Sequence, residues 1–316
     1  MTNAHADTAT TTGGTIAVPS AAPRETRADR WRNFWADYRQ SPVAVVSLGV
    51  ILVLLGVSFG APLVSPQDPY DMAALDWMDA FLRPGTTGSG GYVHVLGTDN
   101  AGRDMLSAIF YGLRTSFVIG ISAGVLALAI GICVGLSAAY FRGRTESVLM
   151  RIVDLQLSMP AILLALVMVA VLGQGVAQIV AALVVAQYAY FARTTHGAAT
   201  VERSKDYIEA ARSTPLPTRR VLLRHLLPNV MPPLIVVATV QVASAIALEA
   251  TLSFLGVGLP LTEPSLGSLI SNGFKYIHTD RTWLSIYPGL FLMVTVVAIN
   301  LVGDQVRTVL DPRRSR

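Results

Sequence analysis

Six apolar stretches, each close to the length needed to cross a lipid bilayer as a helix, constrain the fold of this chain more than any other feature. A helix needs about 20 apolar residues to span the hydrocarbon core. The stretches cover residues 43–64, 116–140, 155–172, 176–192, 233–257 and 283–302. The third and fourth are short, and Gly173-Gln174-Gly175 between them is typical of a tight turn. We therefore expect an all-α membrane protein with six transmembrane helices.

The composition agrees with a membrane protein and excludes several other classes. Of the 316 residues, 52% are hydrophobic and 14% are charged, whereas a soluble domain carries about 25% charged residues. The single cysteine, Cys133, lies inside an apolar stretch, which excludes a disulfide framework and a cysteine metal cluster. The first apolar stretch is longer than the core of a signal peptide, which has about 7–15 residues, so we do not expect it to be cleaved.

The positive charges predict which side of the membrane each loop faces, because cytoplasmic loops carry an excess of Lys and Arg. With the N-terminus inside, 19 of the 24 Lys and Arg residues fall on the inner side and 5 on the outer side. We therefore expect a multi-pass membrane protein with both termini and residues 193–232 in the cytoplasm, and the resemblance given below implies that the membrane is the bacterial inner membrane. Since the arginines lie between apolar stretches, their expected partner is the inner-leaflet surface and not nucleic acid.

This orientation divides the chain into five expected parts. They are a disordered cytoplasmic tail with an interfacial amphipathic helix (1–42), the first transmembrane helix (43–64), an extracytoplasmic loop (65–115), a core of five transmembrane helices (116–306) and a cytoplasmic tail (307–316). The interfacial helix is expected because Trp31, Phe34, Trp35 and Tyr38 recur at helical spacing and form one aromatic face. A disordered basic tail is the alternative.

The second apolar stretch carries small residues on one face of the expected helix. They are Ser116, Gly120, Gly124, Ala127, Gly131 and Gly135. Small residues allow helices to approach closely in a membrane. We therefore expect this helix to be internal, packed against other spans or against a partner subunit.

The polar segment 193–232 is too long for a simple turn and too polar to lie in lipid. Pro215 and Pro217 should break a first helix. A second, basic helix over residues 218–227 is expected to end at Pro228. The pattern predicts a helix-turn-helix projection that docks another protein, and the alternative is a basic segment that only meets anionic lipid.

This segment resembles the EAA loop of permease subunits from binding-protein-dependent ABC importers. The residues that match in type and spacing are Glu209, Ala210, Ala211, Leu227 and Pro228. A family glycine falls on Pro215, which holds φ near about −65°, whereas glycine also permits positive values. The resemblance implies that Glu209 contacts a partner ATPase. It also implies that Arg212, Arg219 and Arg220 support the docking.

A second match lies in the expected extracytoplasmic loop. Residues 94–104 read His-Val-Leu-Gly-Thr-Asp-Asn-Ala-Gly-Arg-Asp. They resemble the His-x-Leu-Gly-Thr-Asp-x-x-Gly-Arg-Asp signature of the C-type subunit of dipeptide, oligopeptide and nickel permeases. The matched residues that we expect to brace this loop are His94, Gly97, Thr98, Asp99, Gly102, Arg103 and Asp104.

The chemistry of this signature predicts a helix start. We expect Thr98 or Asp99 to cap the helix that follows, and Asp104 to lie in its first turn. Arg103 is expected to pair with Asp99 or Asp104. A metal site formed by His94, Asp99 and Asp104 is the alternative, although their spacing does not fit an EF-hand.

Glu249 is a carboxylate inside the fifth apolar stretch, where an unpaired charge is costly and suggests a function by default. The alternative is a brace against a hydroxyl, an arginine or a backbone amide. Gln241 and Ser244 lie on the same stretch and could line a translocation path with it. Residues 249–258 also resemble the peptide and nickel branch, and the whole resemblance covers about residues 30–313.

The resemblance implies a permease half of an ATP-driven ABC importer for peptides or a related small solute, such as a nickel chelate or glutathione. Its implied partners are a second homologous permease subunit in a heterodimer, two ATPase subunits or domains, and an extracytoplasmic substrate-binding protein. The sequence contains no Gly-x-x-x-x-Gly-Lys-Ser/Thr phosphate loop and no hydrolase motif. We therefore expect no enzyme, cofactor or metal in this chain, with ATP and Mg on the partner ATPases. A self-powered secondary transporter or channel is the alternative function.

Overall fold

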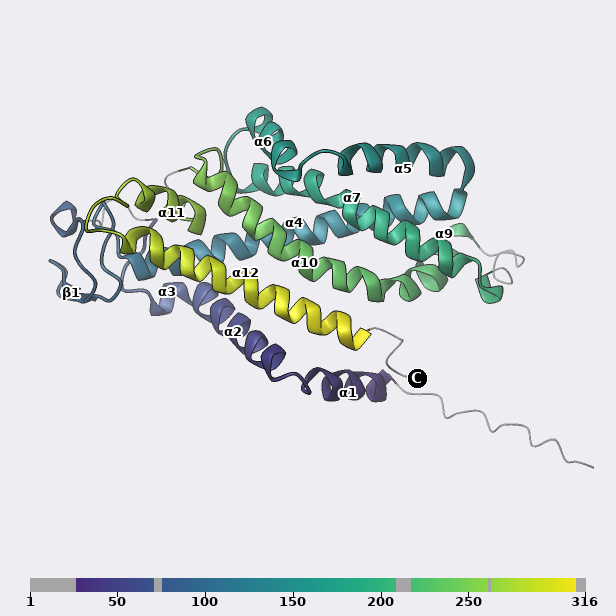
Figure 1. Ribbon diagram of the computed structural model, residues 1–316, viewed down its shortest axis with the longest axis horizontal. Coiled ribbons are helices and arrows are strands. Elements are labelled where there is room, and N and C mark those ends of the chain that lie inside the picture. The colour runs from purple at the N-terminus through teal and green to yellow at the C-terminus, as the bar shows by residue number, and fades with distance from the viewer. Residues whose placement is uncertain (1–26, 71–75, 209–216, 261–262, 311–316) are drawn as a thin grey trace, which may run out of the picture.

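The computed structural model describes residues 27–70, 76–208, 217–260 and 263–310 of the chain. Within these residues the protein is an elongated helical bundle, and most of its long helices run along the longest axis (Figure 1). We call the end with the two short strands the hairpin end, and the opposite end, where α9 lies, the α9 end.

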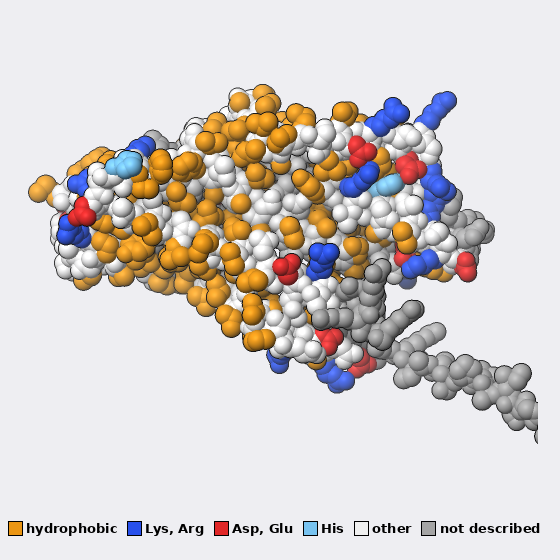
Figure 2. Space-filling view, viewed as in Figure 1, with side chains coloured by type: hydrophobic (Ala, Val, Ile, Leu, Met, Phe, Trp, Pro, Cys, Tyr) orange, Lys and Arg blue, Asp and Glu red, His pale blue; other side chains and the backbone are white. Residues whose placement is uncertain are grey.

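Five helical stretches are long and apolar enough to cross a membrane. They are α2 (Pro42–Phe59), α4 (Met105–Phe141), α7 (Val176–Arg203), the stretch Thr218–Phe254, and α12 (Trp283–Leu310). A sixth crossing results if the bent pair α5 (Gly143–Leu157) and α6 (Ala161–Leu172) is one span. Hydrophobic side chains cover the middle of the visible face, and charged side chains gather towards the two ends (Figure 2). The predicted all-α membrane fold is confirmed, with the sixth span broken.

The expectation of one continuous helix over residues 155–172 is wrong. α5 ends at Leu157 and α6 begins at Ala161, and the two helices meet at 94°. Pro160 causes the break, because proline has no N–H to donate and keeps the preceding residue, Met159, out of the helical region. The side chain of Gln156 holds the bend against α7 by donating to the carbonyl of Val185.

The second span begins earlier than expected. α4 starts at Met105, so the helix predicted directly after the signature is continuous with the second span and is not a separate part of the extracytoplasmic loop. With 37 residues and a rise of about 1.5 Å per residue, α4 is about 55 Å long. It therefore exceeds the hydrocarbon core of about 30 Å, and part of it must stand outside the lipid.

Helical structure enters residues 193–232 from both sides, in agreement with the helices predicted before and after Pro215 and Pro217. α7 continues to Arg203, and helical structure resumes as α9 (Thr218–Arg220), the π-helical stretch η2 (Val221–Leu226) and α10 (Leu227–Phe254). Pro228 does not end a helix as predicted. It lies in the first turn of α10 after the π-helical stretch, a position where the missing N–H breaks no α-helical hydrogen bond.

The N-terminal aromatic pattern forms the expected helix. α1 (Arg27–Tyr38) stacks Trp31, Phe34, Trp35 and Tyr38 in consecutive ring contacts. α1 packs against α12, where the side chain of Gln305 donates to the carbonyl of Asp37 at 3.4 Å. The contact of α1 with lipid stays a prediction.

A small unit between α2 and α4 builds the hairpin end. After α3 (Ala61–Val64) it contains the short helix η1 (Trp77–Asp79) and the antiparallel strands β1 (Thr86–Thr87) and β2 (Val93–His94). We call residues 76–104 the hairpin unit. The short helix α11 (Leu266–Phe274) lies at the same end of the molecule (Figure 1).

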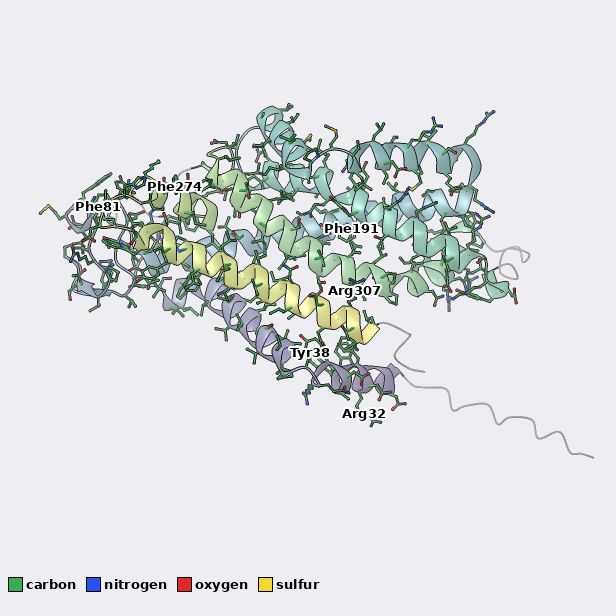
Figure 3. All side chains as sticks on the ribbon, viewed as in Figure 1. Arg32, Tyr38, Phe81, Phe191, Phe274 and Arg307 are labelled. Carbon is green, nitrogen blue, oxygen red and sulfur yellow. The ribbon has the colours of Figure 1, made fainter. Side chains whose placement is uncertain are left out.

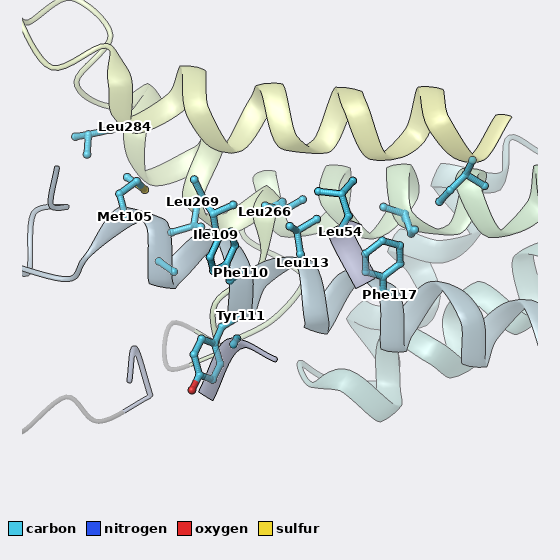
Figure 4. Close-up of a cluster of buried hydrophobic side chains, with 14 of the residues drawn as sticks. Leu54, Met105, Ile109, Phe110, Tyr111, Leu113, Phe117, Leu266, Leu269 and Leu284 are labelled. Carbon is cyan, nitrogen blue, oxygen red and sulfur yellow. The ribbon is translucent and has the colours of Figure 1, made fainter. Parts of the chain in front are cut away.

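Helix packing makes α4 the central element. The α4–α7 pair has the most extensive contact among the described elements, and α4 also packs against α2, α10 and α11. Phe191 of α7 lies in the middle of the bundle (Figure 3). Near the hairpin end, α4 residues pack against leucines of α11 and α12 (Figure 4). The predicted internal position of this small-residue helix is confirmed.

Candidate functional site

A groove of about 1250 Å³ runs along α10 and is bounded also by α7, α12 and the end of α5. Its lining residues are Leu157, Tyr190, Arg193, Thr194, Asn229, Pro232, Pro233, Val236, Val237, Val240, Gln241, Ser244, Arg307 and Leu310. Figure 3 shows Arg307 near the end of α12. The groove thus combines an apolar wall with a few amide, hydroxyl and guanidinium groups, which suits a polar solute of moderate size.

Two of the three residues that were predicted for a translocation path, Gln241 and Ser244, line this groove. The backbone carbonyl of Gln241 accepts a hydrogen bond from the side chain of Gln187 on α7 at 3.3 Å, which ties the two walls together. Nearer the α9 end, Pro232 and Pro233 carry no N–H. The carbonyls one turn earlier therefore lose their usual helical donors.

The third residue, Glu249, lies outside the groove lining and is completely buried. Its carboxylate accepts hydrogen bonds from Ser116 of α4 at 2.9 Å and from Ser253 of α10 at 2.8 Å. Of the two interpretations that the sequence left open, this arrangement favours the hydroxyl brace.

Arg193 marks one wall of the groove and was not singled out by the sequence. It pairs with Asp154 of α5 at 2.9 Å, and both side chains are about half exposed. A pair with this exposure adds little stability, but it places a guanidinium at a defined position beside the groove. Arg193 follows an apolar stretch directly in the sequence, and that position was the signal that could have found it.

The signature residues of the hairpin unit come together at the start of α4. The Nδ1 atom of His94 lies 2.9 Å from the carboxylate of Asp104, and both side chains are buried. Asp104 is the N-cap of α4, since its other carboxylate oxygen accepts from the backbone N–H of Ser107 at 2.8 Å. The predicted cap at Thr98 or Asp99 is therefore wrong, and so is the first-turn position of Asp104. The capping residue directly precedes the helix because only there does its carboxylate reach the free N–H groups.

Thr98 and Asp99 instead organise the loop. The Thr98 hydroxyl accepts from the N–H of Leu82 at 2.8 Å and donates to the carbonyl of Asp79. Asp99 accepts from the N–H of Arg103 at 2.9 Å, and its carboxylate lies 3.8 Å from the Arg103 guanidinium, one of the two predicted pairings. Burial raises the pKa of Asp99, and the charge of Arg103 opposes that shift.

The glycines of the signature are required by the backbone. Gly97 and Gly102 have φ values of 77° and 76°, which L side chains rarely adopt. A Cβ atom on Gly97 would lie 3.2 Å from the indole nitrogen of Trp283, and one on Gly102 would collide with the carbonyl of Asp76. Both glycines are therefore needed for the local backbone of the signature.

Part of the predicted coupling segment lies outside the described residues, namely Glu209, Ala210, Ala211, Arg212 and Pro215. The flanking residues are described. Arg219 and Arg220 are exposed on α9, and Leu227 is half-buried beside the exposed Pro228.

A hydrogen-bonded cluster that the sequence did not reveal joins the two sides of this segment. The hydroxyl of Tyr207 donates to Glu202 at the end of α7 and accepts from the side-chain amide of Asn229 on α10 at 2.8 Å. Lys205 pairs with the same Glu202 at 2.7 Å. Burial and the neighbouring carboxylate raise the pKa of Tyr207 to about 12. The cluster holds the ends of α7 and α10 together where the segment leaves and re-enters the bundle.

Two family models match this chain. Residues 131–316 match the binding-protein-dependent transport system inner membrane component, and residues 29–84 match the N-terminal transmembrane domain of oligopeptide transport permease C. The second match covers α1, α2 and the start of the hairpin unit. Together they include the groove and the segment beside it.

Curated relatives cover nearly the whole chain. The di/tripeptide transport system permease protein DppC of Pseudomonas aeruginosa is 35% identical over 298 residues, which is 94% of this chain and 96% of the relative. The dipeptide permease protein DppC of Escherichia coli K12 is 36% identical over 89% of this chain and 93% of its own. The glutathione permease protein GsiD of Pectobacterium atrosepticum is 34% identical over 90% and 91%.

A solved structure shares the fold. An inward-facing MetNI methionine ABC transporter chain superposes with a TM-score of 0.53 at 22% identity, over 65% of this chain and 97% of that chain. The helical groove, the family match over more than half of the chain and the relatives above lead to one assignment. The chain belongs to the binding-protein-dependent transport system inner membrane components, as a multi-pass permease subunit of the dipeptide and oligopeptide C-type branch in the bacterial inner membrane.

Proposed function

We propose that this chain forms one half of the translocation path of an ATP-driven ABC importer for peptides or a related small solute. The groove along α10 carries the proposal, because Gln241 and Ser244 place amide and hydroxyl groups on its otherwise apolar wall. Peptide backbones offer matching donors and acceptors, and terminal charges can meet the guanidiniums of Arg193 and Arg307. The relatives named for di/tripeptide, dipeptide and glutathione transport support this solute class.

The groove needs a second wall. It is open towards the surrounding space, so this chain alone leaves a solute exposed to lipid on one side, where polar groups are costly. A second homologous permease subunit, as a heterodimer, would close it. The chain supplies half of a path and the partner supplies the other half.

The α9 end is the proposed cytoplasmic end, where residues 193–232 dock a partner ATPase. Arg219 and Arg220 are exposed there, beside the segment that includes Glu209. The lack of a phosphate loop leaves ATP and Mg to the partner ATPases. α7 and the stretch Thr218–Phe254 lead from this docking surface to the groove walls, so movement of the segment reaches the path through packed helices.

The hairpin unit is the proposed extracytoplasmic part, facing a substrate-binding protein. His94 and Asp104 are buried within this unit, and Asp104 caps α4. Contacts made on the hairpin unit would therefore act directly on the start of the central helix. ATP must favour one conformer of this assembly by several kcal/mol to reverse the accessible side.

The coupling role is tested by Glu209→Lys in a complex of this chain with its partner permease, ATPases and binding protein, reconstituted in lipid vesicles. We expect ATP-driven peptide uptake to fall at least about tenfold, the effect of about 1.4 kcal/mol on a binding equilibrium, while membrane insertion stays normal. Asp68→Lys is the matched control, because it makes the same charge reversal at an exposed position near the hairpin end.

Two results would contradict the proposal at different levels. Unchanged uptake with normal co-purification of the ATPase would remove the docking role of Glu209. Uptake by vesicles that contain this chain without any ATPase would remove the importer proposal itself and favour a self-powered transporter.

A further inference from the structure

Asn229 belongs both to the groove and to the hydrogen-bonded cluster at the ends of α7 and α10. Its side chain lines the groove. The same side-chain amide donates to the Tyr207 hydroxyl and to the carbonyl of His225, each at 2.8 Å. The bond to His225 is local, because that residue lies one turn earlier. Tyr207 lies on the other side of the coupling segment, two positions before Glu209. One amide thus connects the groove wall with the residues that lead into the segment.

The start of α10 is set apart from the rest of the helix by its backbone hydrogen bonds. We call residues 227–231 the α10 start. The π-helical stretch η2 precedes them, and Pro232 and Pro233 follow inside the helix. Neither proline has an N–H, so the carbonyls of Pro228 and Asn229 lose their usual helical donors. Proline is a common cause of helix kinks. The α10 start therefore depends on other contacts for its position.

The hydroxyl of Tyr207 bridges the α10 start and the end of α7. It accepts from Asn229 and donates to Glu202, which is buried near the end of α7. Glu202 also pairs with Lys205 at 2.7 Å. Burial and the neighbouring carboxylate raise the pKa of Tyr207 to about 12. The hydroxyl therefore keeps its proton at neutral pH and can make both bonds at once.

Apolar packing holds the same two helix ends close together. Ile208, the residue after Tyr207, is buried in a cluster with Ala199 of α7, Leu226 of η2 and Val230 of α10. Apolar contacts have no preferred direction, whereas hydrogen bonds do. The cluster thus supplies contact area, and the two bonds of the Tyr207 hydroxyl supply an orientation.

We propose that Tyr207 is a positioning residue that attaches the α10 start to the end of α7, so that both groove walls follow the coupling segment when it moves. The inference rests on the proposed function, in which the segment docks an ATPase and the groove carries the solute. Arg193 lines the groove from α7, and Asn229 and Pro232 line it from α10. Without the hydroxyl, the α10 start can turn at the prolines independently of α7, and the motion reaches one wall without the other.

The test compares Tyr207→Phe with Tyr70→Phe in the assembled transporter. Each variant keeps the ring and removes the hydroxyl. Tyr70 is the matched control, because both side chains are 42% exposed and Tyr70 packs on Tyr111, outside the groove lining. Hydrogen exchange of residues 227–231, without nucleotide or peptide, measures how firmly the α10 start is held. Peptide uptake per ATP hydrolysed, in lipid vesicles, measures whether the attachment transmits motion.

We expect Tyr207→Phe to raise the exchange rate of residues 227–231 about fivefold, which corresponds to the loss of one hydrogen bond of about 1 kcal/mol. Uptake per ATP should fall by about the same factor while the ATPase still co-purifies and hydrolyses ATP. Tyr70→Phe should change neither quantity. If exchange or uptake per ATP is unchanged in Tyr207→Phe, or if Tyr70→Phe has the same effect, the positioning role is wrong.

A second variant tests whether Tyr207 acts through Asn229. Asn229→Leu removes the donor at similar size, and the Tyr207 hydroxyl then has no amide to hold. The double variant should therefore exchange no faster than Asn229→Leu alone, whereas independent effects would add and would contradict the inference. Exchange needs neither ATP nor solute. A wild-type complex without ATP-driven uptake would remove the proposed function, and the exchange rates would still decide whether Tyr207 attaches α10 to α7.

Discussion

At the residue scale, the hairpin unit depends on positions that only glycine can occupy. Gly102 combines a φ of 76° with a backbone carbonyl, that of Asp76, in the space that a Cβ would fill. Gly91 has nearly the same φ, 77°, but open space around it. The two residues therefore separate the cost of the backbone conformation from the cost of the close approach.

We predict that Gly102→Ala destabilises the hairpin unit more than Gly91→Ala does. A left-handed conformation costs an L residue about 1–2 kcal/mol in either variant, and overpacking at Gly102 adds about 1–3 kcal/mol. Hydrogen exchange of residues 76–104 in the purified protein measures the difference. If the two variants exchange at the same rate, the contact with Asp76 carries no energy and the backbone conformation alone explains the glycine.

At the scale of the elements, the α4–α7 contact is set by two glycines on one face of α4. A Cβ on Gly131 would lie 2.8 Å from the backbone nitrogen of Ala192, and a Cβ on Gly135 would lie 2.6 Å from the carbonyl of the same residue. In a membrane the hydrophobic effect does not drive helices together, so close van der Waals packing must. These glycines let the two backbones touch.

Gly135→Ala is therefore expected to separate α4 from α7. It should lower the free energy of unfolding of the detergent-solubilised protein by about 1–3 kcal/mol. Gly197→Ala on α7 is the control, because nothing lies within 4 Å of its Cβ position. At that position, alanine should instead raise the free energy of unfolding by up to about 1 kcal/mol, because alanine has a higher helix propensity than glycine. Thermal unfolding of both variants gives the comparison, and a neutral Gly135→Ala would show that the helices adjust without cost.

At the scale of the whole molecule, the protein is polar at both ends with an apolar band between them (Figure 2). The two ends differ in what they carry. The α9 end holds the exposed Arg219 and Arg220, and the hairpin end holds the capped start of α4, the hairpin unit and α11. The groove lies nearer the α9 end and stops before α11.

The proposed orientation has a direct test in intact cells. In the Cys133→Ser background, Thr87→Cys on β1 should react with a membrane-impermeant maleimide from outside once the outer envelope is permeable. Arg144→Cys near the start of α5 should react only after the inner membrane is opened. The expectation follows from the excess of Lys and Arg on the α9 side. Reaction of Arg144→Cys from outside would reverse the orientation.

Features that depend on neighbouring residues were predictable. The length of each apolar stretch predicted the spans, the aromatic spacing predicted α1, and the small residues predicted an internal α4. The errors arose where one proline or one cap decided a boundary. Pro160 bends the third span, Pro228 lies in the first turn of a helix where a helix end was expected, and Asp104 caps α4 in place of Thr98 or Asp99.

The contacts between residues that are far apart in the chain became clear only from the packed structure. Glu249 meets Ser116 across 133 positions of the chain, and the groove forms from segments of four helices. The helices and their membrane class could be predicted from the sequence, because the burial of about 20 consecutive apolar residues is a local energy. Which polar groups share a buried space depends on how closely the helix backbones approach, and that distance exists only once the bundle has packed.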